Sequence, residues 1–344
     1  MTIKLTEFSA AEIAGELELK PFQGRQVFRW LHKKRVFDFD AMTDLSKDLR
    51  QRLKDTAQPA QLAVAQMVKS GQSRGTRKAV FTLTDGETVE AVLIRDRDRR
   101  TVCLSTQVGC PLNCAFCATG ASGFTRDLTP GEMVEQALHL LAGESIEERT
   151  PNIVYMGMGE PFRNYDAVMR SIELLMSKEG LGIGARKITV STAGDVPGIN
   201  RFAKEKRQVR LSISLHAADD ALRSELVPLN RTYPLDALRK AVQDYVDTTG
   251  RQVTLEWVLL RNVNDSVRHA RELMRFLKGI KATVNLIPYN PVPDLRYHAP
   301  EPEACQAFLD ALTQGGVNCT LRRERGQDID AACGQLRRRR RNAK

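Results

Sequence analysis

From about residue 101 onward, short apolar stretches alternate with amphipathic stretches of helical spacing. Such alternation predicts a parallel sheet with crossover helices, built either as an open barrel or as a doubly wound sheet. In both architectures, ligands bind at the carboxyl ends of the strands, so residues at those ends are the first candidates for a site. The expected strands are TVCLSTQ, NIVYMGMG, KITVST, VRLSISLH, QVTLEWVLL, TVNLIPY and NCTLRRE.

The residues before this alternation form two segments of different character. Residues 1–60 have helical spacing, and Ser9 followed three places later by Glu12 predicts a capped helix start. Residues 61–100 alternate apolar and polar residues around an Asp-Gly turn at 85–86, which predicts a β-hairpin extension of two or three strands. We therefore expect a helical domain over 1–60, a β extension over 61–100, a core over 101–323 and a C-terminal segment over 324–344.

The charge of the chain suggests a polyanionic partner. Lys and Arg number 52 against 42 acidic residues, which gives a net charge of +10. RNA and DNA are the first candidates, and a merely basic soluble protein is the alternative. Basic residues gather in one expected helix, where they form either an RNA-facing surface or a solvated helix face over the core: Arg25, Arg29, Lys33, Lys34 and Arg35, beside Phe28 and Trp30.

Two features of the sequence predict a cytoplasmic protein with metal or redox chemistry. No apolar run approaches the length of a membrane span, and the N-terminus lacks the apolar region of a secretory signal, so we expect the cytoplasm. Seven cysteines are an odd number, which argues against a disulfide framework of the secreted kind.

Three of the seven cysteines fall within eight positions, at Cys110, Cys114 and Cys117. Their spacing would also suit small buried residues on one face of a helix. Flanking glycines and Pro111 argue against that helix and favour a loop around an inorganic centre. Three thiolates leave one position of a zinc ion, or one iron of a four-iron cluster, without a protein ligand. An open position of this kind suits chemistry better than structural support.

The cysteine loop resembles the cluster-binding loop of the radical-SAM superfamily, because it has the pattern Cys-x3-Cys-x2-Cys directly after the first expected strand. Together with MGMGEP, SLHA, VNLIPYNP and GQDIDAACGQL, it closely resembles the RlmN/Cfr family of radical-SAM RNA adenine-C-methyltransferases over nearly the whole chain. The resemblance implies a partial (β/α)6 barrel with an N-terminal helical accessory domain and a small β extension.

The resemblance also implies two cofactors. Cys110, Cys114 and Cys117 would hold a [4Fe–4S] cluster, whose vacant iron binds the amino and carboxylate groups of S-adenosylmethionine (SAM). Taken singly, some of the implied SAM contacts have simpler explanations: His216 could be a core histidine, and Asn290 before a proline could be a turn residue. The implied contacts all lie near the ends of expected strands: Gly159, Glu160, Ser191, Ser214, His216 and Asn290.

Three further residues acquire catalytic roles through the resemblance. Cys333 would be methylated by one SAM, and a radical from a second SAM would convert that methyl group into a methylene bridge to adenine. Cys103 would then attack the Cys333 sulfur and release the RNA, leaving a disulfide. Glu90 would be the acid/base carboxylate. Without the resemblance, all three would be read as structural or exposed residues, as Cys305 and Cys319 still are.

The implied activity is methylation of carbon 2 of one adenine in large-subunit ribosomal RNA and of the adenine next to the anticodon in tRNAs. The nearest alternative is the Cfr type, which methylates carbon 8; the long N-terminal segment favours carbon 2. A zinc-dependent RNA-binding module and a radical-SAM activase of a protein are more distant alternatives. We also expect a reductant for the cluster and for the Cys103–Cys333 disulfide, no membrane association and a monomer. The Arg337–Arg341 run would either bind RNA phosphates or be a solvated tail.

Overall fold

The computed structural model describes residues 2–145, 150–205, 207–293, 295–322 and 326–337. Its centre is a ten-stranded sheet in the order β14-β13-β12-β11-β10-β9-β6-β5-β4-β3. The strands from β6 to β14 pair in parallel with their neighbours, which confirms the predicted parallel sheet. They are β6 (Arg99–Cys103), β9 (Asn152–Tyr155), β10 (Ile188–Thr192), β11 (Arg210–Ser214), β12 (Val253–Leu259), β13 (Ala282–Pro288) and β14 (Cys319–Leu321).

The β extension continues this sheet instead of forming a layer of its own. Strands β3 (Ala63–Lys69), β4 (Arg77–Thr82) and β5 (Thr88–Asp96) are antiparallel, and β5 pairs with β6. The turn between β4 and β5 contains Gly86 at φ +85°, so the predicted Asp-Gly hairpin is confirmed. The expected boundary at residue 100 falls within β6, inside one hydrogen-bonded sheet, and the four-part division of the chain stays a prediction.

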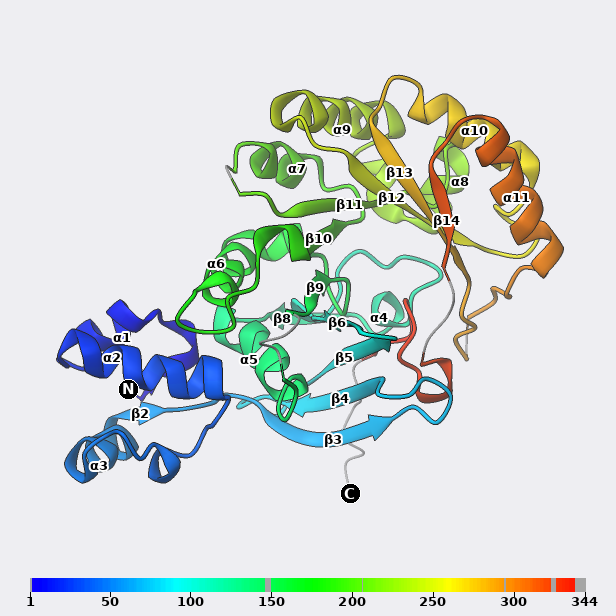
Figure 1. Ribbon diagram of the computed structural model, residues 1–344. Coiled ribbons are helices and arrows are strands. Elements are labelled where there is room, and N and C mark those ends of the chain that lie inside the picture. Colours follow the sequence, from blue (N-terminus) through cyan, green and yellow to red (C-terminus); the bar gives the residue numbers. More distant parts are fainter. Residues whose placement is uncertain (1, 146–149, 206, 294, 323–325, 338–344) are drawn as a thin grey trace.

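Helices cover the outer face of the parallel strands, as Figure 1 shows. Alternate strand residues point outward against these helices; Trp257 of β12 is fully buried and contacts the ring of Phe308. The other residues of each strand point into the barrel, and many of them are polar. The helices are α5 (Pro130–Leu140), α6 (Tyr165–Met176), α7 (Val196–Ala203), α9 (Leu235–Thr249), α10 (Val267–Leu277) and α11 (Pro302–Gln314). The short helix α8 (Asp220–Leu226) lies instead at the carboxyl ends of the strands, next to the cysteine loop.

The N-terminal residues form a helical lobe beside the barrel (Figure 1). Ser9 and Glu12 make the predicted capping box at the start of α1. Phe28 and Trp30 are buried in the core, and Trp30 donates a hydrogen bond to Asp44. These two aromatic rings therefore support the lobe and are not available to stack on RNA bases. The helices of the lobe are α1 (Ala10–Glu16), α2 (Pro21–Phe28) and α3 (Lys47–Thr56).

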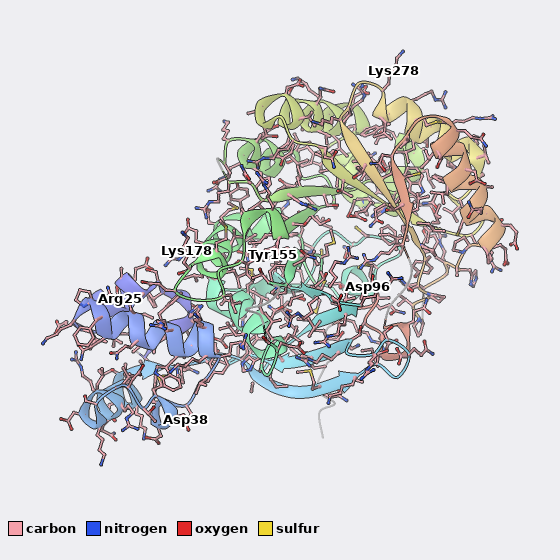
Figure 2. All side chains as sticks on the ribbon, viewed as in Figure 1. Arg25, Asp38, Asp96, Tyr155, Lys178 and Lys278 are labelled. Atoms are coloured by element: carbon pink, nitrogen blue, oxygen red, sulfur yellow. The ribbon has the colours of Figure 1, made fainter. Side chains whose placement is uncertain are left out.

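The basic residues of this lobe differ in exposure. Arg25, Arg29, Lys33 and Lys34 are exposed, and Figure 2 places Arg25 on the lobe away from the barrel. Arg35 is partly buried and donates a hydrogen bond to the backbone oxygen of Glu144. The lobe therefore presents cations to solvent, and beside them on α2 it exposes one aromatic side chain, Phe22.

Shorter elements complete the described chain. They are β1 (Ile3–Lys4), β2 (Ala57–Gln58), β7 (Gln107–Gly109), β8 (Phe124–Asp127), α4 (Ala118–Ala121) and short turns of helix at Leu5–Glu7, Arg29–Lys34, Phe39–Ala41, Pro161–Asn164, Ala185–Lys187, Pro228–Arg231 and Gln327–Ile329. Across the described ranges, no helix combines the length and apolarity needed to cross a membrane.

Candidate active site

A cavity of about 180 Å³ opens at the carboxyl ends of the parallel strands. Its walls come from the cysteine loop, from the ends of β6, β9, β10, β11, β12 and β13, and from the C-terminal segment. Every site residue predicted from the sequence except Glu90 lines this cavity: Cys103, Cys110, Cys114, Cys117, Gly159, Glu160, Ser191, Ser214, His216, Asn290 and Cys333.

The loop after β9 approaches the loop after β6 so closely that only glycine fits. A Cβ on Gly157 would lie 2.7 Å from the Leu104 backbone, and a Cβ on Gly159 would lie 2.6 Å from Thr106 Oγ1. Gly159 also has φ +104°, which L side chains rarely adopt. These two glycines therefore allow the loops after β6 and β9 to come into direct contact.

This approach places the carboxyl group of Glu160 inside the cavity wall. Its Oε2 accepts a hydrogen bond of 2.8 Å from the backbone N–H of Ala193, and Oε1 accepts one of 3.1 Å from Phe162. Burial raises the pKa of Glu160 to about 7, although these hydrogen bonds lower it in part. A cationic ammonium group beside it would stabilise the ionised form, which suits the predicted contact to SAM.

The cysteine loop is irregular between β7 and α4, so the one-helix alternative is wrong. Gly109 has φ +80°, and a Cβ there would lie 1.8 Å from the Gly123 carbonyl oxygen. The backbone N–H of Cys110 donates to that same oxygen at 2.9 Å. Helix α4 begins only after Cys117.

The three thiols of this loop fit an iron–sulfur cluster. None is in a disulfide, and they are close enough for their charges to interact. Burial raises the pKa of Cys110 to about 12 and holds that of Cys114 well above its usual range, so thiolates here need a cationic centre. Within the described residues, no three side chains converge as they would around one metal ion. A cluster distributes soft thiolate ligands over different irons.

His216 is held as a neutral ring at the end of β11. Its Nδ1 accepts a hydrogen bond of 3.0 Å from the backbone N–H of Val258, and its backbone has φ +61°, which is unusual for a residue with a side chain. Burial, and then the charge of Arg223, lowers the pKa of His216 to about 3. The ring of Phe116, in the cysteine loop, packs edge-on against the His216 ring, with 4.8 Å between the two ring centroids. His216 therefore joins the cysteine loop to the barrel.

Arg223 of α8 links the chain segments that follow strands β10 and β11. It is fully buried and donates to the backbone oxygens of Leu215 at 3.1 Å and Ala193 at 2.7 Å, and to Asn230 Oδ1 at 2.8 Å. Burial lowers its pKa to about 10, so the guanidinium remains charged at neutral pH. Arg223 thereby fixes the loops that follow β10 and β11, which carry predicted SAM contacts.

The C-terminal segment crosses the open side of the barrel and carries Cys333 into the cavity. The N–H of Ala118 donates to the Gly334 carbonyl oxygen at 2.8 Å, and Thr119 Oγ1 donates to the Leu336 oxygen at 2.5 Å. Gln327 Nε2 donates to Asn290 Oδ1 at 2.8 Å. Asn290 therefore contacts both the cavity and this segment. Of the basic run, only Arg337 lies within the described residues.

Cys103 and Cys333 face each other across the cavity closely enough to interact electrostatically. Cys103 is the last residue of β6, paired with Val154 of β9. Burial, and next the negative charge of Cys333, raises the pKa of Cys103 to about 12. Arg322 Nη1 lies 3.3 Å from Cys333 Sγ. The two cysteines thus share one cation.

Glu90 is the one predicted site residue that lies apart from the cavity. Its carboxylate is fully buried in β5, where Oε1 lies 3.4 Å from Lys78 Nζ and Oε2 accepts a hydrogen bond of 3.2 Å from the backbone N–H of Arg337. Lys78 also donates to the Asp330 carbonyl oxygen at 3.0 Å. The pair therefore anchors the C-terminal segment on the β extension.

The sequence reasoning missed the charged residues inside the barrel, chiefly Arg223, Glu256 and Arg322. Glu256 and Arg322 had a readable signal, because each is a charged residue within or just after an otherwise apolar strand pattern. Arg223 had none, because the short helix that carries it, α8, was not itself expected from the sequence.

Comparison with known proteins gives the same family over most of the chain. Residues 4–58 match the ribosomal RNA large subunit methyltransferase N-terminal domain, and residues 104–277 match the radical SAM superfamily. A relative from Thermoanaerobacter sp. (strain X514), named a probable dual-specificity RNA methyltransferase RlmN, is 46% identical over 92% of each chain. A relative of the same name from Bacillus licheniformis is 48% identical over 92% of this chain and 88% of its own.

A solved structure agrees with this assignment. The crystal structure of a radical SAM methyltransferase from Sphaerobacter thermophilus has a TM-score of 0.94 and 46% identity, and the match covers 97% of this chain and 99% of that one. The two proteins thus share one fold over nearly the whole of both chains. The chain belongs to the RlmN family of radical SAM methyltransferases.

Proposed function

We propose that the protein methylates carbon 2 of a specific adenine in large-subunit ribosomal RNA and of the adenine next to the anticodon in tRNAs. One observation carries the proposal: a docked C-terminal segment brings Cys333 into the cavity that also holds the three-thiol loop and Cys103. The printed names of the relatives and the net charge of +10 agree with RNA as the substrate. The carbon-8 alternative has no comparable support.

The proposed chemistry depends on a [4Fe–4S] cluster held by Cys110, Cys114 and Cys117 and on SAM held by Glu160 and the strand ends. Together they supply a one-electron oxidant able to remove a hydrogen atom from a methyl group. The role of the surrounding residues is to orient the SAM and to exclude water. The electron-poor carbon 2 of adenine cannot attack a sulfonium methyl group as a nucleophile, so the methyl group has to reach it by another route.

In our proposal, Cys333 provides that route. Its thiolate takes the methyl group from one SAM, forming the C–S bond as the sulfonium bond breaks. After hydrogen removal, the sulfur-bound carbon bonds to carbon 2 of adenine. The adduct then loses one electron, for which the cluster would be the acceptor, and its carbon-2 proton passes to a base. The Cys103 thiolate then attacks the Cys333 sulfur, forming the S–S bond as the C–S bond breaks, and the released carbon takes up a proton.

The proposed activity is tested on the product nucleoside. Cluster-loaded protein is incubated anaerobically with SAM, a reductant and unmethylated RNA, and the RNA is digested for mass spectrometry against authentic 2-methyladenosine and 8-methyladenosine. We expect 2-methyladenosine from the enzyme and neither product from the Cys333→Ala variant. Formation of 8-methyladenosine alone would assign the carbon-8 activity and contradict the proposal.

Glu90 is our proposed base, and its position gives that role a sharp test. The Glu90→Gln variant can still accept a hydrogen bond from the N–H of Arg337, but its amide is not a base. If Glu90 removes the carbon-2 proton, the variant accumulates a covalent Cys333–RNA adduct, visible as a protein band shifted by RNA. Normal turnover by Glu90→Gln, with loss of activity only in Glu90→Ala, would limit Glu90 to anchoring the C-terminal segment.

The finer properties of the protein stay predictions. We expect a separate electron donor for the cluster and a dithiol or low-molecular-weight thiol that reduces the Cys103–Cys333 disulfide after each turnover. We also expect a monomer in the cytoplasm. The part of the arginine run beyond residue 337 lies outside the described residues; if it binds RNA, its deletion should flatten the salt dependence of RNA affinity.

A further inference from the structure

Arg322 stands between two cavities of the barrel. It follows β14 and lines both the active-site cavity and a second cavity of about 660 Å³ at the amino ends of the strands. Its Nη1 lies 3.3 Å from Cys333 Sγ, within the range of a hydrogen bond to sulfur. A guanidinium cannot lose its proton in proteins, so it offers a permanent positive charge to whichever sulfur is ionised.

A second buried acidic residue, Glu256 of β12, is close enough to Arg322 to interact with it electrostatically. Glu256 accepts hydrogen bonds of 2.8 Å from Ser212 Oγ and 2.6 Å from Asn285 Nδ2, and it lines the same two cavities as Arg322. Burial raises the pKa of Glu256, while these two bonds and the Arg322 charge lower it. An ionised Glu256 needs a cation near it in this interior, and Arg322 is that cation.

The charges that act on Arg322 come from both cysteines and from Glu256. The negative charge on Cys333 is the largest cause that raises the pKa of Arg322, followed by those on Glu256 and Cys103, against desolvation. Burial and the Cys333 charge raise the pKa of Cys103, whereas Arg322 lowers it. One cation therefore interacts with two sulfur atoms that oppose each other's ionisation.

We propose that Arg322, held in place by Glu256, is a positioning residue that stabilises negative charge first on the Cys333 sulfur and then on the Cys103 sulfur. The inference rests on the proposed function, because it assigns an order to the two cysteines that this function uses. Methylation of Cys333 replaces a thiolate with a neutral thioether. The repulsion that opposes ionisation of Cys103 then disappears, and the guanidinium is left with Cys103 as its sulfur partner.

This arrangement gives the order a physical cause. Before methylation, Cys333 has the direct contact with Arg322, while burial and the Cys333 charge oppose ionisation of Cys103. After methylation, the same charge favours the Cys103 thiolate, which the release step requires. The switch is therefore the methyl group itself, and it needs no movement of the fold.

The first experiment measures thiol reactivity in the full-length, cluster-loaded protein without SAM. The protein is treated anaerobically with iodoacetamide at pH 7.5, and alkylation of each cysteine peptide is followed by mass spectrometry. We expect Arg322→Met to slow alkylation of Cys333 by about tenfold, because the variant removes the cation that lies beside its sulfur. Arg322→Lys, which keeps the charge, should recover most of the rate.

Cys319 provides the internal control, since it lies in β14 three residues before Arg322. If Arg322→Met only loosened β14, both Cys319 and Cys333 would react faster. A Cys333 rate that is unchanged or faster in Arg322→Met overturns the inference. An inactive enzyme with the expected alkylation pattern would instead contradict the proposed function, so the two failures can be distinguished.

A second experiment tests the transfer of the charge to Cys103. Cys333→Met gives residue 333 a neutral thioether, and we expect it to accelerate alkylation of Cys103 at pH 8.0 by about tenfold. The double variant Cys333→Met with Arg322→Met should lose most of this acceleration. The cavity is no smaller in the double variant, so easier access cannot explain a slower rate. Equal acceleration in the single and double variants would contradict the role of Arg322.

Discussion

At the scale of single residues, the site depends on close backbone contacts that allow no side chain. Gly159 is the clearest case, because it combines a positive φ of +104° with a Cβ position 2.6 Å from Thr106 Oγ1. Gly182 also has a positive φ, of +62°, but a Cβ there would meet no atom within 4 Å. A side chain at Gly182 would therefore cause backbone strain alone, whereas a side chain at Gly159 would cause both backbone strain and a steric clash.

We predict that Gly159→Ala weakens SAM binding by more than tenfold and lowers the free energy of unfolding by about 2–3 kcal/mol, because the loop after β9 has to move away from β6. Gly182→Ala should cost about 1 kcal/mol and leave SAM affinity unchanged. Calorimetric titration of cluster-loaded protein with SAM, together with urea unfolding, measures both effects. Equal SAM affinity in Gly159→Ala and the wild type would show that the close contact does not shape the site.

The resemblance to the family named most of the candidate site residues, and the strand patterns predicted that they lie together. Parallel strands bring their carboxyl ends to one edge, so Ser191, Ser214 and His216 were expected at one place. Glu90 could not be judged in this way. Its surroundings depend on Lys78 and Arg337, which are brought together by an antiparallel hairpin and by a segment far away in the chain.

At the scale of secondary-structure elements, α5 connects the helical lobe to the barrel through one carboxylate. Glu135 is buried and accepts hydrogen bonds from Thr6 Oγ1 at 2.5 Å and from the backbone N–H groups of Gln61 and Leu62 at 2.8 Å. These donors precede β3 in the chain, whereas Glu135 lies in the first barrel helix. Burial raises the pKa of Glu135 to about 7 despite the hydrogen bonds.

This raised pKa predicts a pH dependence of stability with a definite sign. The folded protein binds the Glu135 proton more tightly than the unfolded chain, so this contribution is present below about pH 4.5 and is lost as the pH rises through 7. Glu135→Gln does not titrate. Its unfolding free energy relative to wild type should therefore increase by up to about 3 kcal/mol between pH 4.5 and pH 8.0.

Urea unfolding of both proteins in the same cluster state, at pH 4.5 and at pH 8.0, measures that difference. A matched control is Glu12→Gln, since the hydrogen bonds of Glu12 to Ser9 and Arg170 lower its pKa despite desolvation. That variant should lose stability relative to wild type as the pH rises. If instead the wild type became more stable than Glu135→Gln as the pH rises, the raised pKa of Glu135 would be contradicted.

Long amphipathic helices such as α6, α9 and α10 could be predicted from spacing, whereas α7, α8 and α4 were missed. The missed helices have eight residues or fewer, and their caps and glycines look like loop sequence. The continuity of the β extension with the barrel sheet was also unpredictable. It depends on pairing of β5 with β6, which leaves no local signal in either strand.

At the scale of the whole molecule, exposed cations of the helical lobe lie at the opposite end of the molecule from α10. Figure 2 shows this separation through Arg25 and Lys278. If RNA reaches the cavity across the lobe, charges there should contribute to affinity and charges on α10 should not. Arg25 and Arg29 are exposed on or next to α2, and Arg271 and Lys278 are exposed on or next to α10.

We predict that the double variant Arg25→Gln/Arg29→Gln reduces the slope of log affinity against log salt concentration by about 1.4–1.8, because two phosphate contacts are lost. The control Arg271→Gln/Lys278→Gln removes the same charge from the far side and should leave the slope nearly unchanged. Filter binding of tRNA between 50 mM and 200 mM salt measures both. An equal reduction of the slope in the two double variants would mean that RNA affinity depends only on the net charge of the protein, and not on where the charges lie.

The whole account depends on a methyl group carried by Cys333, and one measurement tests this directly. Cluster-loaded protein is reduced anaerobically with SAM and without RNA, and the peptide that contains Cys333 is analysed by mass spectrometry. We predict a single methyl group on Cys333, and its transfer when RNA is added. A Cys333 peptide without the methyl group, together with methylated adenine made by the Cys333→Ala variant, would contradict the account.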